Sequence, residues 1–393
     1  MKKHTVKIPG TGELRCTCFK RCGGCQLDMS YKEQLEWKQQ KAERMFSRFC
    51  QVEPVLPMEK PYHYRNKVKT AFTLDAHSKL LSGVYQSGSG RVTATEDCML
   101  EDEICTRAVL VFKQLMSSFK LRLYDPSTRK GTVRHLLTRY SRATGQLMVC
   151  ICIGSESFPS KEQFAREFKR LCPQLETLVL NINTKPLPLT LGDKNIVLSG
   201  SGYIEDELLG KRFRISPQSF YQVNSVQTGI LYSEAIKLAE LKQDDVLIDA
   251  YCGTGTIGIL CADSVSRVIG AELDSAACKD AEVNICLNHL ENVTVINEDA
   301  GRFMSRLADE NAHIDVVVTD PPRAGCDKRF LDSLAKLSPD RVVYISCRIE
   351  SLERDLKILY RLGYKAVKLQ PVDMFPHTTG IETIALLKKR QPE

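Results

Sequence analysis

The sequence has 393 residues, of which 43% are hydrophobic and 26% are charged, a composition typical of a globular protein with two or three domains. It contains no run of eighteen apolar residues, and no apolar segment follows the basic N-terminus. From these absences we expect no membrane-spanning helix and no secretory signal, and therefore a cytoplasmic protein. The net charge of +7 is concentrated in residues 1–70, where fifteen Lys and Arg residues stand against seven Asp and Glu residues. Such a bias indicates either a polyanion-binding face or an ordinary solvated helical surface.

Cysteines dominate the first predicted segment. Sixteen cysteines without an export signal indicate reduced thiols, a metal site or catalysis rather than a disulfide framework. Cys16, Cys22 and Cys25 are clustered with glycines near the N-terminus, and Cys18 lies among them. Together with a remote fourth cysteine, such a cluster can bind zinc or an iron–sulfur centre, and the spacing alone does not decide between them.

An amphipathic helix is predicted over residues 30–49. Ser30 is a suitable N-cap, and Glu33 three residues later completes a capping box. An approximate apolar stripe supports this helix, formed by Leu35, Ala42, Met45, Phe46 and Phe49. A linker punctuated by prolines follows, so residues 1–60 are predicted to be a cysteine segment followed by one helix.

Residues 61–215 are predicted to form an α+β middle domain. Its predicted strands are Lys67–Leu74, Leu80–Tyr85, Leu147–Ile153 and Leu175–Asn183, and its predicted helices are Cys105–Phe119 and Lys161–Leu171.

Residues 216–393 alternate between strand and helix patterns. The predicted strands are Asp245–Ala250, Arg267–Glu272, Val293–Glu298, Asp315–Asp320, Arg341–Cys347, Lys365–Asp373 and Glu382–Lys388. The connection between the last two is too short for a crossover helix, so these strands must pair antiparallel. Five parallel strands followed by a hairpin predict an α/β fold, with a class I, Rossmann-like methyltransferase domain at the C-terminal end.

A glycine-rich loop follows the first of these strands. Gly253, Gly255 and Gly258 fit the G-x-G-x-x-G pattern between a strand and a helix, where glycines allow close approach of a ligand. Glu272 ends the next strand and is expected to bind both ribose hydroxyls of a nucleotide-like cofactor. Asp299 follows the third strand, where it is expected either to receive an adenine amino group or to cap a helix. This loop alone fits NAD as well as S-adenosylmethionine, and it can also be a tight turn without a ligand.

Two further strand ends carry candidate chemistry. Asp320-Pro-Pro-Arg323 is a stiff turn, because both prolines have a fixed φ. Cys347 follows the next strand. Carbon 5 of uracil attacks a methyl sulfonium only after a thiolate has added to carbon 6, and a base must then remove the proton at carbon 5. Cys347 is the candidate thiolate, although an isolated strand-end cysteine is more often a buried core residue. Glu382 is the candidate base, and His377 is the second choice.

These residues together resemble the RNA 5-methyluridine methyltransferases, and the resemblance covers most of the chain. The matching segments are Pro217–Asn224, Tyr251–Gly255, Asp320–Gly325, Ser346–Cys347 and Asp373–Glu382. The resemblance implies that Cys347 is the nucleophile and Glu382 the base. It also implies a cofactor site for S-adenosylmethionine formed by Gln222, Tyr251, Gly253, Gly255, Thr256, Glu272, Asp299 and Asp320. Thr256 departs from the pattern of some members, which have Asn there.

The cysteine spacing resembles the branch of this family that acts on 23S ribosomal RNA. In that branch three clustered cysteines and a distant fourth, here Cys98, hold a [4Fe-4S] cluster. The resemblance therefore implies a cluster on Cys16, Cys22, Cys25 and Cys98, although Cys18 can compete with Cys16. The transfer-RNA branch lacks these cysteines, so the expected substrate is 23S ribosomal RNA.

The function expected from the sequence is methylation of carbon 5 of a uridine that is flipped out of folded RNA, by a monomeric enzyme. Candidate RNA contacts in the middle domain are Tyr64–Lys67 and Gly131–His135, which are equally well read as ordinary surface charge. The alternatives are a transfer-RNA uracil-C5 methyltransferase and a non-catalytic iron–sulfur RNA-binding protein. An amino-methylating enzyme is disfavoured, because Arg323 stands where that class has an aromatic residue.

Overall fold

The computed structural model describes residues 6–7, 14–86, 89–184 and 190–390, and it divides into two compact units. The first unit takes Met1–Ser30, Lys60–Glu207 and Arg214–Gln218, and the second takes Tyr31–Glu59, Leu208–Phe213 and Ser219–Glu393. This grouping differs from the three predicted segments, because the cysteine segment joins the middle domain whereas the helix after it joins the C-terminal domain. The extreme N-terminus, on which the prediction of no secretory signal rests, lies largely outside the described residues.

The first unit is built on a seven-stranded sheet of order β5-β4-β3-β6-β7-β8-β9. Its strands are β3 (Lys67–Leu74), β4 (Leu80–Tyr85), β5 (Val92–Ala94), β6 (Val133–Tyr140), β7 (Leu147–Ile153), β8 (Leu175–Ile182) and β9 (Lys194–Ser199). All neighbours pair antiparallel except β7 and β8, which are parallel. The four strands predicted here are confirmed as β3, β4, β7 and β8. β6 is hard to predict from sequence, because His135 and Arg139 are buried and interrupt its apolar pattern.

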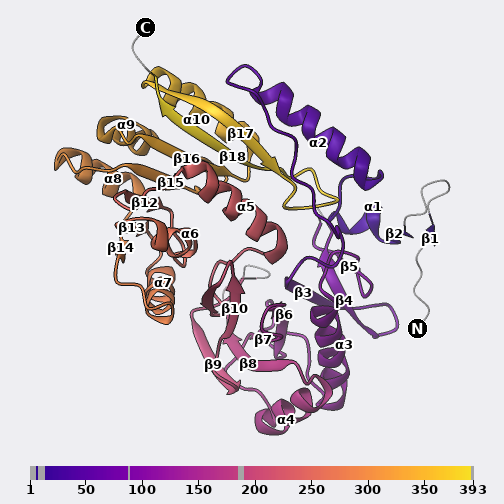
Figure 1. Ribbon diagram of the computed structural model, residues 1–393. Coiled ribbons are helices and arrows are strands. Elements are labelled where there is room, and N and C mark those ends of the chain that lie inside the picture. Colours follow the sequence, from indigo (N-terminus) through magenta and orange to yellow (C-terminus); the bar gives the residue numbers. More distant parts are fainter. Residues whose placement is uncertain (1–5, 8–13, 87–88, 185–189, 391–393) are drawn as a thin grey trace. The chain divides into compact units, whose positions relative to one another are not determined.

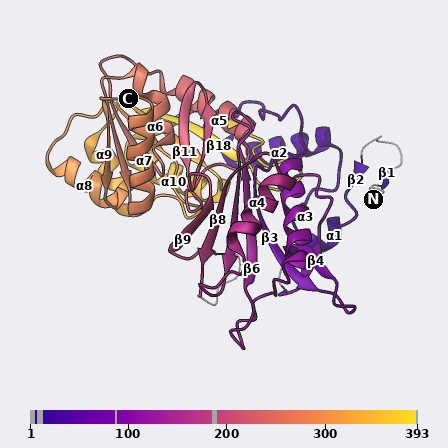
Figure 2. The ribbon, with the colours of Figure 1, turned by 90° about the horizontal axis from the view of Figure 1, so that it is seen from below.

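Two helices pack on this sheet, α3 (Glu103–Ser118) and α4 (Lys161–Leu171). Both were expected from the sequence, and their apolar side chains share one core with the strands. Figure 2 shows both helices alongside the strands. The remaining short elements outside the two main sheets are β1 (Val6–Lys7), β2 (Leu14–Arg15), α1 (Phe19–Cys22), β10 (Ile204–Leu208) and β11 (Lys211–Ile215).

The second unit contains a seven-stranded sheet of order β14-β13-β12-β15-β16-β18-β17. The strands are β12 (Val246–Ala250), β13 (Arg267–Glu272), β14 (Val293–Asn297), β15 (Val316–Thr319), β16 (Arg341–Ser346), β17 (Tyr364–Val372) and β18 (Glu382–Lys389). β12 to β16 are parallel, whereas β18 is antiparallel to both β16 and β17. The predicted five parallel strands and terminal hairpin are therefore confirmed, and every boundary lies within one residue of its prediction.

Helices cover both faces of this second sheet. They are α2 (Tyr31–Phe46), α5 (Ser225–Ala239), α6 (Thr256–Cys261) with a 3-10 turn at Ala262–Ser264, α7 (Ser275–Leu287), α8 (Ala300–Asp309), α9 (Lys328–Leu337) and α10 (Ile349–Arg361). On one face α2, α8, α9 and α10 contribute to a single apolar core. The helices α5, α6 and α7 pack on the same strands from the other side (Figure 1). No helix in the described ranges is both long and apolar enough to cross a membrane.

The helix α2 buries a face that its apolar residues do not predict. Gln34, Lys38, Ala42 and Phe46 are buried, whereas Leu35 of the predicted stripe is only half-buried. These four residues are spaced by four and therefore lie on one side of a helix. Two of them are polar, so their burial requires polar partners in the structure rather than apolar contact alone.

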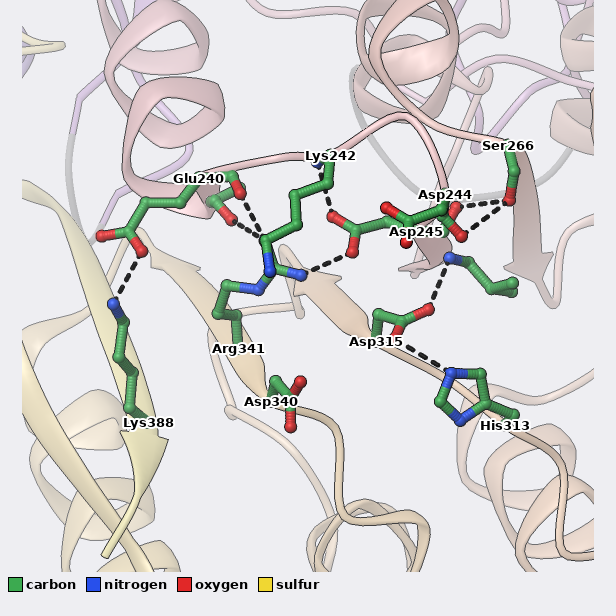
Figure 3. A network of polar contacts seen from close by, with 12 residues as sticks. Glu240, Lys242, Asp244, Asp245, Ser266, His313, Asp315, Asp340, Arg341 and Lys388 are labelled. Atoms are coloured by element: carbon green, nitrogen blue, oxygen red, sulfur yellow. Dashed lines mark hydrogen bonds and ion pairs between the residues drawn. The ribbon is translucent and has the colours of Figure 1, made fainter.

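A polar network joins the N-terminal ends of the parallel strands, at the end of the sheet opposite the strands' carboxyl ends (Figure 3). The Arg341 guanidinium pairs with the Asp245 carboxylate at 2.6 Å, and both side chains are more than nine-tenths buried. The same guanidinium donates to the carbonyl oxygen of Glu240 after α5. Asp315 accepts a hydrogen bond from the backbone N–H of Val246 at 2.8 Å. The starts of β12, β15 and β16 are thus linked through side chains.

We expect Arg341→Met to lower the free energy of unfolding by about 3–5 kcal/mol, because it leaves the buried Asp245 carboxylate without its cation. Chemical denaturation of the two proteins measures this difference. A double variant that also carries Asp245→Asn should recover part of the loss, since no buried charge then remains. A single variant as stable as the parent protein would contradict the prediction.

Candidate active site

The register of the hairpin brings Cys347 and Glu382 together. Ser346 at the end of β16 pairs with Thr383 on the antiparallel strand β18. Cys347 is one residue beyond Ser346, and Glu382 is one residue before Thr383, so the two occupy neighbouring positions across the ladder. Cys347 is half-buried and Glu382 is buried. A thiol and a carboxyl group 35 positions apart in the sequence therefore lie side by side.

The charges around Cys347 set the state of its thiol. Burial raises the pKa of Cys347, and the carboxyl groups of Glu382 and Asp320 raise it further. The guanidinium of Arg323, in the loop that begins at Asp320, lowers the same pKa. Burial and the two carboxyl groups therefore favour the protonated thiol, and Arg323 is the cation that favours the thiolate.

Three buried carboxyl groups, those of Asp249, Asp320 and Glu382, interact at this end of the sheet. Burial raises the pKa of Asp249 and of Asp320 to about 7 in each case, and that of Glu382 to about 8. The charge of Asp320 adds to the rise at both Asp249 and Glu382. Asp249 Oδ2 accepts a hydrogen bond from the N–H of Gly258 at 2.7 Å, whereas its buried Oδ1 has no partner. This cluster favours a cationic ligand, because a positive charge would relieve the mutual repulsion.

The glycine-rich loop has the strained geometry that a tight strand-to-helix turn requires. Tyr251, Gly253 and Gly255 all have positive φ, at 62°, 55° and 76°. Glu272 holds the loop, because its Oε2 accepts from the N–H of Gly253 at 3.0 Å and its Oε1 accepts from the N–H of Asp274 at 2.8 Å. An amide already bonded to a carboxylate is poorly placed for a pyrophosphate, so the loop favours S-adenosylmethionine over NAD.

Of the remaining predicted cofactor residues, Gln222 lies in the segment before α5, whereas Thr256 and Asp299 lie at the starts of α6 and α8. Gln222 forms a hydrogen bond with the buried Tyr232 of α5, whose pKa is raised by burial and by the nearby Asp320. The hydroxyl of Thr256, the first residue of α6, lies 3.2 Å from that of Thr254. Asp299 caps α8 by accepting from the N–H of Arg302 at 3.0 Å, which is one of its two expected roles. Its adenine contact stays a prediction.

The loop that leads into Glu382 is held by helix α2. The ammonium of Lys38 pairs with the Asp373 carboxylate at 2.5 Å, with both side chains fully buried, and it also donates to the carbonyl oxygen of Phe375 at 3.1 Å. The amide of Gln34 accepts from the N–H of His377 at 2.8 Å and lies 3.1 Å from its Nδ1. His377 thus has a structural partner, which weakens its candidacy as the base.

Sequence reasoning missed several of these groups. No local signal marks Lys38 or Gln34, because a polar residue on a helix is usually exposed. Tyr232 is equally inconspicuous within α5. Asp249 could have been selected as a candidate, since a carboxyl group within an apolar strand is a sign of a perturbed site.

The cysteine segment belongs to the first unit. Cys16, Cys22 and Cys25 interact electrostatically, and Cys98 interacts with Cys25. Backbone N–H groups donate to the sulfurs of Cys16 and Cys22, at 3.4 and 3.3 Å. The N–H groups that follow Cys98 also bond to its sulfur. Across the part of the chain that the structure describes, however, no group of three or more His, Cys, Asp or Glu side chains is arranged to hold a metal ion.

We expect Asp320→Asn to stabilise the ligand-free protein at pH 8 by on the order of 1–3 kcal/mol. The folded pKa of Asp320 is raised from 3.8 to about 7, so its contribution to stability is greatest below pH 4 and is lost as the pH rises to about 7. The neutral amide escapes that loss. Denaturation midpoints at pH 4, 6 and 8 should therefore show a gap that widens with pH. A constant gap would contradict this assignment.

Comparison with known proteins assigns the chain to a protein family. The family model described as tRNA (Uracil-5-)-methyltransferase matches residues 30–390. The chain belongs to this family. Cys16, Cys22 and Cys25 lie before the matched region, so the match does not bear on the cysteine segment.

Individual members of the family agree with this assignment. An uncharacterized RNA methyltransferase of Clostridium tetani is 38% identical over 95% of this chain and 82% of its own length. An uncharacterized RNA methyltransferase of Listeria monocytogenes serotype 4b is 39% identical over 95% of this chain and 83% of its own length. The Pyrococcus abyssi tRNA (uracil-54, C5)-methyltransferase, solved in complex with S-adenosyl-L-homocysteine, has a TM-score of 0.78 and 25% identity, covering 98% of this chain and 91% of that chain.

The comparisons confirm the predicted family at the level of RNA uracil-5-methyltransferases, and they confirm the fold of a SAM-dependent methyltransferase. They do not distinguish ribosomal from transfer RNA, because the relatives in Clostridium and Listeria are named only as RNA methyltransferases. The 23S ribosomal RNA substrate and the iron–sulfur cluster therefore remain predictions.

Proposed function

We propose that this protein transfers a methyl group from S-adenosylmethionine to carbon 5 of a uridine in folded RNA through a covalent adduct with Cys347. The observation that carries this proposal is the adjacency of the Cys347 thiol and the Glu382 carboxyl group across β16 and β18. The reaction at carbon 5 requires a nucleophile and a base that reach the same uracil ring.

The residues at the strand ends fit S-adenosylmethionine, which supplies an electrophilic methyl group when bound. Its sulfonium and ammonium charges match the carboxyl cluster of Asp249 and Asp320, and the unpartnered Oδ1 of Asp249 is available as an acceptor. Glu272 keeps a free lone pair on each oxygen for ribose hydroxyls. Gln222, Tyr251, Gly253, Gly255, Thr256 and Asp299 complete the proposed site.

The chain's own groups then act in sequence. Cys347 gives up its proton to solvent, and the positive charge of Arg323 stabilises the thiolate. The thiolate adds to carbon 6 of uracil, which makes carbon 5 nucleophilic. Carbon 5 takes the methyl group as the bond between the methyl carbon and the sulfonium sulfur breaks, and S-adenosylhomocysteine is the leaving group. Glu382 removes the proton from carbon 5, the double bond between carbons 5 and 6 forms again, and the thiolate leaves carbon 6. The raised pKa of Glu382, about 8, makes it a stronger base than an ordinary glutamate.

For the substrate we propose 23S ribosomal RNA, on the resemblance of the cysteine segment to the ribosomal RNA branch. To test this, the purified protein is incubated with S-adenosylmethionine and either deproteinised 23S ribosomal RNA or unmodified transfer RNA. Nucleoside mass spectrometry then measures 5-methyluridine in each RNA. 5-Methyluridine in ribosomal RNA alone supports the proposal. 5-Methyluridine in transfer RNA alone would establish the alternative enzyme, and none in either RNA would favour a non-catalytic RNA-binding protein.

We also propose that Cys16, Cys22, Cys25 and Cys98 hold a [4Fe-4S] cluster, on the resemblance of their spacing to the ribosomal RNA branch. Cys25 interacts electrostatically with the other three cysteines, and backbone N–H groups donate to the sulfurs of Cys16, Cys22 and Cys98. Such N–H donors stabilise the negative charge of metal-bound sulfur. Cys18 is the least suited, because its thiol donates to the carbonyl oxygen of Ala94 at 3.2 Å.

Protein purified without oxygen is expected to contain about four irons per chain. Cys98→Ser should lose most of this iron, because it removes the ligand that ties the N-terminal cysteines to the sheet of the first unit. Cys18→Ser is the matched control and should keep it. Metal analysis of the three proteins measures this, and stoichiometric zinc without iron would refute the cluster while leaving the methyltransferase proposal intact.

A further inference from the structure

A buried carboxylate on α10 joins the two segments that carry the candidate catalytic groups. Asp355 is fully buried. Its Oδ2 accepts from the Tyr344 hydroxyl at 2.7 Å, three residues before Cys347 on β16. The same oxygen accepts from the backbone N–H of Cys326 at 2.9 Å, at the end of the loop that begins at Asp320. One oxygen atom thus spans the strand of Cys347 and the loop of Asp320 and Arg323.

The neighbouring Arg354 completes this attachment. Its guanidinium pairs with Oδ1 of Asp355, with Nε at 2.8 Å and Nη2 at 2.7 Å, and Nη2 also donates to the carbonyl oxygen of Cys326 at 3.1 Å. Both backbone groups of Cys326 are therefore held by adjacent residues of one helix. The pairing compensates the charge of a carboxylate that would otherwise be costly to bury.

The loop passes so close to the Asp355 carboxylate that a glycine, Gly325, is needed at the point of closest approach. Gly325 has a φ of +79°, and a Cβ atom there would lie 2.5 Å from Asp355 Oδ2 and 2.6 Å from Arg354 Nη2. A side chain at this position would force either the loop or the Asp355 and Arg354 side chains to shift, and the positive φ would strain it. Gly325 and Asp355 therefore act together in setting the path of the loop.

The position of this loop matters for Cys347 because it carries Arg323. The charged groups that face the Cys347 thiol are Glu382 on β18 and Asp320 and Arg323 in the loop. Of these only Arg323 favours the thiolate. Arg323 itself is exposed, so its place beside the thiol depends on the backbone that carries it.

We propose that Asp355, compensated by Arg354, is a positioning residue that holds the Asp320–Cys326 loop against Cys347 and thereby keeps Arg323 where it promotes the thiolate. The role of the thiolate in methyl transfer rests on the proposed function above. The electrostatic interaction between Arg323 and the thiol does not rest on it, and this interaction is tested without RNA or cofactor.

The experiment measures the pH dependence of Cys347 alkylation by iodoacetamide, followed by mass spectrometry of the peptide that contains Cys347. In Asp355→Asn the apparent pKa of Cys347 should move up by about 0.5–1 pH unit, because Arg323 drifts away from the thiol. Arg323→Gln should produce a similar rise directly. The double variant should add little to either single change, since both remove the same interaction.

Arg341→Met is the stability control, because it destabilises the same unit at the other end of the strands. It should leave the alkylation profile of Cys347 unchanged. If Asp355→Asn does not fold, as judged by circular dichroism, the same alkylation measurement is made on Arg354→Gln. This variant is expected to fold, because half of the Arg354 side chain is exposed and the Asp355 carboxylate is kept. A parental profile in the folded variant, a shift that adds fully to that of Arg323→Gln, or an equal shift in Arg341→Met would overturn the proposal.

The same variants separate this inference from the proposed function. With RNA and S-adenosylmethionine, a folded Asp355→Asn should lose about 10–100-fold in kcat, as expected when a catalytic group is misplaced. A shifted alkylation profile in a protein whose parent does not methylate RNA would support the positioning role and refute the proposed function. If the parent protein methylates RNA and Asp355→Asn has an unshifted alkylation profile, the proposed function stands and the positioning role is refuted.

Discussion

Replacing Cys347 with Ala is expected to reduce methyl transfer by about 10⁴-fold or more, as removal of a catalytic nucleophile typically does. Without the thiol, carbon 5 of uracil stays too weak a nucleophile to attack the methyl group. The affinity for S-adenosylmethionine should change less than about twofold, because the thiol is not assigned a contact with it. Transfer of a tritiated methyl group to RNA and calorimetric titration of the cofactor measure the two quantities.

The control for this variant is Cys286→Ala, which removes an exposed cysteine on α7 and should leave the rate unchanged. Comparison of the two excludes a general effect of losing an accessible thiol. Turnover in Cys347→Ala within tenfold of the parent would eliminate the covalent mechanism, even if the protein remained an RNA methyltransferase.

Replacing Glu382 with Gln is expected to trap the enzyme on its substrate. The thiolate can still add to carbon 6 and carbon 5 can still take the methyl group, but no base removes the proton from carbon 5. The adduct between protein and RNA should accumulate to nearly one per enzyme, while multiple turnover falls by about 10²–10⁴-fold. Denaturing gels with labelled RNA detect the adduct, and a Cys347→Ala/Glu382→Gln double variant should show none.

The pH dependence of kcat/KM in the parent protein is a second test of Glu382 as the base. Its pKa is raised to about 8, and the base must be ionised to act, so kcat/KM should rise as the pH increases toward 8. The raised pKa of Cys347 acts in the same direction. Glu350→Gln, which removes an exposed carboxylate near Cys347, should keep both the rate and this profile. A Glu382→Gln variant with normal turnover and no adduct would assign the base to another group.

Much of the second unit follows from local sequence patterns. Each of its strands has a short apolar run bounded by loop residues, and glycine and proline occur where the backbone must turn sharply. For that reason the predicted boundaries of β12 to β18 agree with the structure. The same patterns place the glycine-rich loop, Asp320 and Cys347 at the carboxyl ends of parallel strands, where ligands bind in such sheets.

The first half of the chain was less predictable, because burial in β6 and α2 does not follow side-chain polarity. β6 carries His135 and Arg139 at buried positions, and α2 buries Gln34 and Lys38. Polar residues can be buried when a partner satisfies them, and for Lys38 that partner is Asp373, more than three hundred residues away. No window of sequence contains both members of such a pair.

The sequence by itself determined the fold class of the C-terminal domain, the family and the candidate nucleophile, because each rests on short motifs whose residues are close together along the chain, whatever the distance between one motif and the next. Only the tertiary structure decided that Glu382 lies beside Cys347, that α2 belongs to the second unit, and that Asp355 joins the Asp320 loop to β16. These features depend on strand register and on the burial of charged groups. Both are set by interactions between distant segments, whose free energies local propensity does not contain.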